Sequence, residues 1–113
     1  MKNKMSAFEK YYDFIENLKN KNIDREQVEL CKKFIQVNWS NDKCLPGRAQ
    51  TIHSHLAKGI VEHLFGKYVS SEAFILAADE LGYENDVLDD NKNTWIKYRV
   101  YYEQNAFNPI LER

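Results

Sequence analysis

The 113-residue sequence is poor in the residues that build loops and cross-links, with four glycines, two prolines and two cysteines. Scarce glycine and proline argue against collagen-like, linker-rich and turn-dense β architectures. Two cysteines, Cys31 and Cys44, are too few for a disulfide scaffold, so we expect two reduced thiols in a cytoplasmic protein. A Cys31–Cys44 bond, or a metal ion shared by the two thiols, would have no further cysteine nearby to support it.

A long apolar run and a strong net charge are also missing. The basic residues 1–5 are followed by mixed apolar and charged positions, which is not the pattern of a signal peptide or a transmembrane helix. The net charge of −1 is not that of a typical DNA-coating protein. Because 43% of the residues are hydrophobic and 29% are charged, we expect one soluble folded domain over 1–113, with no membrane partner.

Helical periodicity dominates the first two thirds of the chain. Ser6 and Glu9 form a capping-box pattern, and Asp24 is a second N-cap candidate. Gly66 and Gly82 follow apolar helical patterns, as residues that end a helix do. The predicted helices cover about 7–20, 25–38, 48–65 and 70–81.

Two of these predicted helices have features that need a packing partner. Gly59, inside the helix 48–65, costs about 1 kcal/mol relative to alanine, so we expect another helix to cross there. In the helix 70–81, Ile75 and Leu76 flank the packed face, which makes the helix apolar around most of its circumference. Such a helix is either central in the fold or partly covered by a partner.

The segment 94–106 fits two patterns. Ile96, Tyr98 and Val100 alternate with polar residues, as in a strand, whereas Trp95, Tyr98, Tyr102 and Ala106 form a helical stripe. Because no second strand is evident to pair with it, we predict a helix over about 94–106. The resulting fold class is all-α, a compact bundle of about five short helices. The alternative is four helices plus a C-terminal strand or hairpin.

Histidines are the first candidates for chemistry, and all three lie in the predicted helix 48–65. His53 and His55 point in opposite directions, and His53 and His63 are about 15 Å apart along the axis, so neither pair chelates one ion. We expect His53 and His63 to be partly buried and His55 to lie on the surface. An enzyme using these histidines with Glu62 is the third hypothesis; we predict no enzyme, no catalytic residue, no metal site and no cofactor.

The acidic segment 84–91 matches a calcium-binding loop only in part. Asp89, Asn91 and Asn93 fit positions one, three and five of an EF-hand, but Thr94 replaces the required glycine and Val100 the final glutamate. We therefore predict a solvated loop.

Charge is distributed unevenly along the chain. Residues 1–67 carry 12 Lys and Arg against 8 Asp and Glu, whereas residues 68–113 carry 4 against 9. An acidic end beside an apolar helix could meet a positively charged surface on a protein. The predicted partner-binding residues are Ile75, Leu76, Asp79, Glu80, Glu84, Asp86, Asp89 and Asp90.

Nucleic-acid binding is the alternative hypothesis. The helix 71–80 has no side chain suited to reading base edges and carries three acids, so a helix-turn-helix is disfavoured. A weaker form of this hypothesis is that the basic N-terminal half and a basic aromatic segment bind single-stranded nucleic acid. The residues predicted for it are Arg48, Lys58, Trp95, Lys97, Tyr98, Arg99 and Tyr101.

One stretch also resembles a known group of proteins. The pattern Gly66-Lys67-Tyr68-Val69-Ser70, followed by Ala73-Phe74 and Ala77-Ala78, resembles a core found in small helical proteins of phages and related mobile genetic elements. Ser71-Glu72 stands where those proteins usually carry Asn-Gly. The resemblance implies a small accessory protein that acts on a host-encoded or element-encoded partner, and it implies no enzymatic activity.

These observations lead to a hypothesis of function. We expect a small cytoplasmic accessory or inhibitor protein of a phage or mobile element, of which a counter-defence factor is one form. It would act by binding a protein through the acidic residues and the apolar helix face. A homodimer through the helix 70–81 is compatible with each hypothesis.

Overall fold

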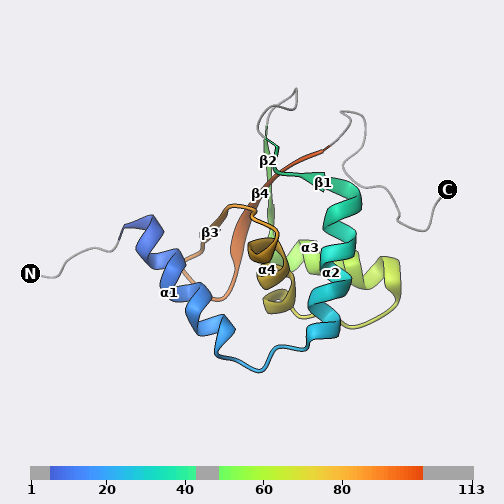
Figure 1. Cartoon of the computed structure of the whole chain (residues 1–113), viewed down its shortest axis with the longest axis horizontal. Coiled ribbons are helices and arrows are strands. Elements are labelled where there is room, and N and C mark those ends of the chain that lie inside the picture. Colours follow the sequence, from blue (N-terminus) through green and yellow to red (C-terminus); the bar gives the residue numbers. More distant parts are fainter. Residues whose placement is uncertain (1–5, 43–48, 101–113) are drawn as a thin grey trace, which may run out of the picture.

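The computed structural model describes residues 6–42 and 49–100 (Figure 1). Within them, four helices and four short strands form a mixed α/β fold, so the predicted all-α helical bundle is wrong. The alternative of four helices with a C-terminal strand or hairpin omits three of the four strands in its strand form and two in its hairpin form. In chain order the elements are α1 (Ala7–Lys19), α2 (Arg25–Asn38), β1 (Trp39–Ser40), β2 (Gln50–His53), α3 (Ser54–Phe65), α4 (Ser71–Glu80), β3 (Asn85–Val87) and β4 (Thr94–Val100).

The sheet is built around β4, which pairs antiparallel with each of the other three strands. Ile96 pairs with Ile52 of β2 on one edge of β4 and with Asn85 of β3 on the other edge. β1 pairs further along, opposite Arg99 and Val100, on the edge that β2 does not occupy. Every partner is at most four residues long, so β4 alone holds the sheet together.

β4 overturns the prediction of a helix over 94–106. Thr94, Ile96 and Tyr98 are buried and alternate with the exposed Trp95 and Lys97, which is the period of two that a strand imposes. The alternation in the sequence was therefore the correct signal for 94–100. The rest of that prediction, from residue 101 on, lies outside the described residues.

Three of the predicted helices are confirmed close to their expected bounds, because their caps are present. Ser6 and Glu9 form the reciprocal capping box of α1. Asp24 accepts a hydrogen bond from the backbone N–H of Glu26 at the start of α2, and Ser70 accepts from Ala73 at the start of α4. The helix predicted over 48–65 begins only at Ser54, because residues 50–53 pair with β4 as β2.

The core centres on Trp39 and on α4. The fully buried Trp39 ring stacks on Tyr98 with a centroid distance of 4.3 Å and meets Phe74 edge-on at 5.5 Å. α4 lies between α1 and α2 (Figure 1), and all six of its residues from Ala73 to Ala78 are buried. We expected this apolar helix to be either central in the fold or partly covered by a partner, and α4 is central.

A second, smaller apolar cluster joins α1 to α4. Phe14, Ile15 and Leu18 of α1 pack with Ile75 of α4, apart from the larger cluster around Trp39. Two polar contacts reinforce this attachment: the Tyr11 hydroxyl donates to Asp79, and Lys21 pairs with Glu72 at 2.7 Å. α1 is thus held to the domain mainly through one face of α4 and through its contacts with β3.

The glycines have different roles. Gly66 and Gly82 follow α3 and α4 with φ values of 66° and 86°, so both adopt the left-handed conformation expected after a helix. Gly59 has a different environment from the one predicted. No described atom lies within 4 Å of the position a Cβ would take there, so the expected helix crossing is absent.

Candidate binding surface

One side of the sheet is covered by the core, and no described helix or strand covers the other. The residues on the outward positions of the three paired strands are Thr51, His53, Asp86, Trp95, Lys97 and Arg99, which we call the open sheet face. Residues directly opposite each other in an antiparallel pair point to the same side, so Trp95 lies between His53 and Asp86, and Lys97 lies beside Thr51. The open sheet face is thus a single continuous surface.

Trp95 is the large aromatic side chain of this face and is 43% exposed. Its ring meets the His53 ring edge-on, with centroids 5.4 Å apart. His53 is itself fixed, because its Nδ1 accepts a hydrogen bond from the backbone N–H of His55 and so caps α3. Trp95 is therefore held against a side chain that the fold already positions, a preorganisation that reduces the entropy lost on binding.

The charges of the open sheet face balance one another. The Lys97 ammonium pairs with Glu84 at 3.1 Å, and the Lys97 backbone N–H donates to the Glu84 carbonyl. Asp86 lies opposite Trp95 in the register, and Arg99 lies two positions beyond Lys97. The open sheet face and its edge thus carry two cations, Lys97 and Arg99, and two carboxylates, Glu84 and Asp86.

A cavity of about 310 Å³ lies beside β4, and Ala49, the residue before β2, is among the residues that line it. Lys97, Tyr98 and Arg99 line it on β4, while Ser40, Asn41, Gly82 and Glu84 line it on the facing segments. Asn41 donates to the carbonyls of Leu81 and Gly82, which holds the rim of the cavity in place. The cavity extends the open sheet face with polar groups of both charge signs.

The structure separates the residues predicted for nucleic-acid binding. Trp95, Lys97 and Arg99 share the open sheet face, whereas Tyr98 points to the core and stacks on Trp39. Lys58 lies on α3, where its ammonium pairs with Glu62 at 3.2 Å and lies 5.5 Å from the centre of the Tyr68 ring. Arg48 and Tyr101 lie outside the described residues.

The apolar part of the predicted partner-binding surface is buried. Ile75 is fully buried under α1, and Leu76 is 5% exposed within the main core. Neither side chain is available to a partner, so this part of the prediction is wrong. The expected homodimer through the same helix loses its contact surface for the same reason.

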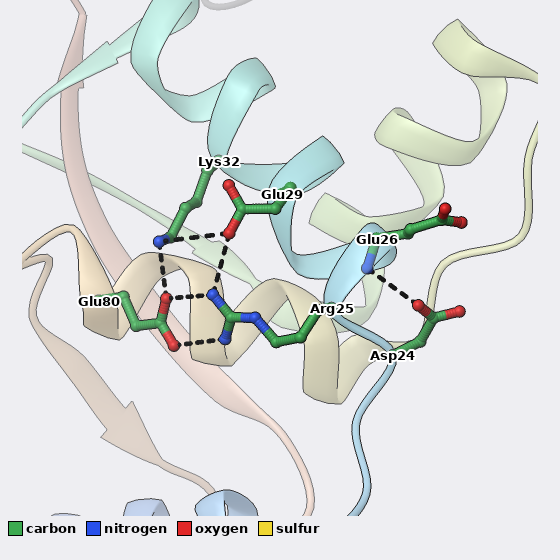
Figure 2. A network of polar contacts seen from close by, with 6 residues as sticks. All are labelled: Asp24, Arg25, Glu26, Glu29, Lys32 and Glu80. Carbon is green, nitrogen blue, oxygen red and sulfur yellow. Dashed lines mark hydrogen bonds and ion pairs between the residues drawn. The ribbon is translucent and has the colours of Figure 1, made fainter.

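Glu80 is engaged in an ion-pair network between α2 and the end of α4 (Figure 2). Its carboxylate accepts hydrogen bonds from both terminal nitrogens of Arg25, at 2.7 and 3.0 Å. It also forms an ion pair with the ammonium of Lys32 at 2.7 Å. Glu29 completes the network through Arg25 and Lys32. The hydrogen bond from Arg25 is the main reason why the pKa of Glu80 falls to about 2.

Most of the other predicted acids also have partners within the chain. Asp79 accepts from Tyr11, and Glu84 pairs with Lys97. Asp90 accepts from the backbone N–H groups of Lys92 and Asn93 in the turn between β3 and β4, so it shapes the loop, and these bonds lower its pKa. Asp86 and Asp89 are exposed. Most of the predicted acidic residues therefore make contacts within the fold, and they do not form one free acidic patch.

One histidine caps a helix, and the other two are exposed to solvent. His53 caps α3, His55 is exposed as expected, and His63 is exposed where partial burial was predicted. Glu62 accepts from the Val69 backbone N–H at 3.1 Å and pairs with Lys58, and these contacts lower its pKa. Among residues 6–42 and 49–100, no group of three metal-binding side chains comes together.

Cys31 is buried in the main core, and burial raises its thiol pKa to about 12. Such a thiol is a packing residue, because the reactive thiolate is strongly disfavoured there. Cys44 lies outside the described residues, so its expected state is not addressed by the fold.

Sequence reasoning missed the double role of His53 and the role of Ser54. The Ser54 hydroxyl donates to Asn93 at 2.9 Å and accepts from the Thr94 backbone N–H, so it fixes the start of α3 to the start of β4. Gln50-Thr51-Ile52-His53 has one buried apolar residue and no clear alternation, so the sequence carried little signal for β2 against the helical stripe of 48–65.

Comparison of the chain with protein-family models, with curated proteins and with solved structures finds no match. Within the part of the chain that the structure describes, no helix has both the length and the apolar character needed to cross a membrane.

Proposed function

We propose that the protein is a small accessory or inhibitor protein of the cytoplasm that binds a protein partner through the open sheet face. The observation that supports this function is Trp95, a 43% exposed tryptophan on a strand whose opposite side is buried. Tryptophan is enriched among the few residues that dominate binding energy at protein interfaces. Surrounding Asp86, Lys97 and Arg99 would form the polar rim that encloses such a residue.

The charge balance of the open sheet face favours a protein over a nucleic acid. Binding of single strands depends on a positively charged groove, and its affinity comes largely from neutralised phosphates. Here Glu84 already pairs with Lys97, and Asp86 lies beside Trp95. The resemblance of the segment around Gly66–Ala78 to small phage proteins supports an accessory role, with counter-defence as one form.

An affinity capture with matched variants tests this function. Tagged wild-type protein, Trp95→Ala and Tyr68→Ala are incubated with nuclease-treated native cytoplasm, and bound proteins are identified by mass spectrometry. Tyr68 is the control because it is also an exposed aromatic residue, in the connection between α3 and α4. We expect one stoichiometric protein with the wild type and Tyr68→Ala and its loss with Trp95→Ala; retention by all three baits contradicts the proposal.

Single-strand binding remains a second candidate, because Trp95, Lys97 and Arg99 follow one another on the same side of β4. Base stacking on the indole would contribute about 1–3 kcal/mol per base. If this function holds, a labelled oligonucleotide binds at low salt, and both Trp95→Ala and Lys97→Ala weaken that binding. Absence of binding at low salt eliminates this candidate.

A further inference from the structure

The exposed ring of Trp95 lies between two side chains that the strand register sets beside it. Asp86 is paired directly with Trp95 across β3 and β4, and His53 is paired with it across β2 and β4. Side chains at directly opposite positions have their Cβ atoms about 4.5–5.5 Å apart and point to the same side of the sheet. The indole therefore has a carboxylate on one flank and an imidazole on the other.

Most acidic residues near Trp95 are engaged within the fold, whereas Asp86 is not. Glu84 pairs with Lys97 at 3.1 Å, and Asp90 accepts from two backbone N–H groups of its own turn. Asp86 is exposed, and it makes no hydrogen bond or ion pair in the part of the chain that the structure describes. Its negative charge is thus available to a group from outside the protein.

Among the described residues, no lysine or arginine side chain lies over the Trp95 ring. The ring contact of Trp95 is with His53, at 5.4 Å between centroids. Lys97, the next outward residue of β4, directs its ammonium to Glu84. Arg99 lies four positions from Trp95, which is about 13 Å along a strand. The exposed indole and the carboxylate beside it thus form a site for a positive charge that the described residues do not supply.

The hairpin of β3 and β4 strengthens this preference for a cation. Residues 84–97 carry two lysines against four Asp and Glu, a net charge of −2. Such a field steers a basic surface toward the open sheet face and speeds the encounter. A phosphate backbone would meet the same field as repulsion.

We propose that Trp95 and Asp86 together bind an arginine side chain of the protein partner. The inference rests on the proposed function, in which the open sheet face binds a protein, and it names the chemistry of the contact. Tryptophan is the aromatic residue whose face attracts a cation most strongly. A planar guanidinium stacks on the indole while its N–H groups donate to the carboxylate beside the ring, whereas a lysine ammonium is a point charge without that plane.

Nuclear magnetic resonance of the ¹⁵N-labelled whole chain tests the contact without the partner. The chain has two tryptophans, so it gives two indole N–H signals, and that of the buried Trp39 is the internal control. The probes are acetylated glycyl-arginyl-glycinamide and the same peptide with lysine or glutamine in the centre, each up to about 100 mM at constant ionic strength. We expect the arginine peptide to shift the Trp95 signal most, the lysine peptide less and the glutamine peptide not at all. A Trp95 signal that ignores the arginine peptide, or that responds equally to lysine, overturns the inference.

Two variants with the same change of charge locate the site. Asp86→Asn should weaken binding of the arginine peptide about fivefold, because an exposed ion pair contributes up to about 1 kcal/mol. Asp89→Asn is the matched control, since Asp89 is exposed in the turn beyond the end of β3. Both residues are exposed, so both variants should fold, which the same spectra verify. An equal effect of the two variants would reduce the contact to general electrostatic attraction and overturn the site.

The affinity capture separates this inference from the proposed function. At equal amounts of bait, we expect Asp86→Asn to retain about fivefold less of the partner than Asp89→Asn does. If the partner is lost with Trp95→Ala but retained in full with Asp86→Asn, the open sheet face binds a protein and the arginine contact is wrong. If Trp95→Ala also retains the partner, the proposed function itself fails.

Discussion

At the residue scale, Tyr11 connects α1 to α4 through the hydrogen bond from its hydroxyl to Asp79. Burial, and then the Asp79 carboxylate, raise the Tyr11 pKa above its ordinary value of 10. Because the native state binds the phenolic proton more tightly than the unfolded chain, the stability that Tyr11 contributes falls as the pH rises above about 10. We expect the unfolding free energy of Tyr11→Phe, measured with urea, to depend less on pH in this range.

The same variant has a second expected effect near neutral pH. Removing a hydrogen bond to a carboxylate should lower the unfolding free energy by about 1–2 kcal/mol. Tyr12→Phe is the control, because Tyr12 is 57% exposed on the same helix. An equal loss of stability in the two variants would show that the Asp79 contact contributes nothing specific.

Glu80 gives the opposite dependence on pH. Its pKa of about 2 in the native state lies below the ordinary value of 4.5, so its contribution is complete above about pH 4.5 and disappears as the pH falls toward 2. We expect Glu80→Gln to lower the unfolding free energy at pH 7 by about 1 kcal/mol, since the network is partly exposed. Urea titrations should show this difference shrinking at acid pH, and a difference that is constant with pH would contradict the pairing.

Residue patterns with a local physical basis were predictable. The capping box at Ser6 and Glu9, the cap at Asp24 and the left-handed Gly66 each depend on a few neighbouring residues, and each is present in the fold. The partners of the acidic residues were not predictable in this way. Glu80 meets Arg25 across 55 residues of sequence, and Tyr11 meets Asp79 across 68.

At the scale of the element, one glycine inside α3 and one directly after it have opposite expected behaviour. Gly66 has a φ of 66°, so Gly66→Ala should destabilise the protein by about 1 kcal/mol. Gly59 has helical geometry and open space, so Gly59→Ala should stabilise the protein by up to about 1 kcal/mol. Thermal unfolding of both variants checks this pair; destabilisation by Gly59→Ala would refute the assignment.

β4 shows why the fold class could not be derived from local patterns. Its alternation was visible, but a strand is stable only with partners, and its partners are segments of two to four residues, of which β1 and β2 lie 41 or more residues upstream. β2 was hidden at the start of a helical stripe, and β3 was part of an acidic segment. The open sheet face depends on the same pairings, so the sequence identified Trp95, Lys97 and Arg99 but could not separate them from Tyr98.

At the scale of the whole molecule, the two apolar clusters divide the domain unequally. α1 contributes to the small cluster around Ile75, whereas α2 and α4 share the large core around Trp39. Local opening requires less energy where fewer apolar contacts are broken. In native-state hydrogen exchange, we expect the amides of α1 to exchange faster than those of α2 and α4. Equal protection of the three helices would show that the clusters open as one unit.

The position of β4 in the chain has a consequence for how the protein is made. Its three partners all precede it in the sequence, and the two residues of β1 lie 59 and 61 positions upstream of the residues they pair with. During synthesis, α1 and α2 can form from local contacts, but no strand of this sheet finds its partner until residues 94–100 leave the ribosome. A chain interrupted before Thr94 would therefore carry helices and three unpaired strand segments, with the inner face of the sheet unable to close over Trp39.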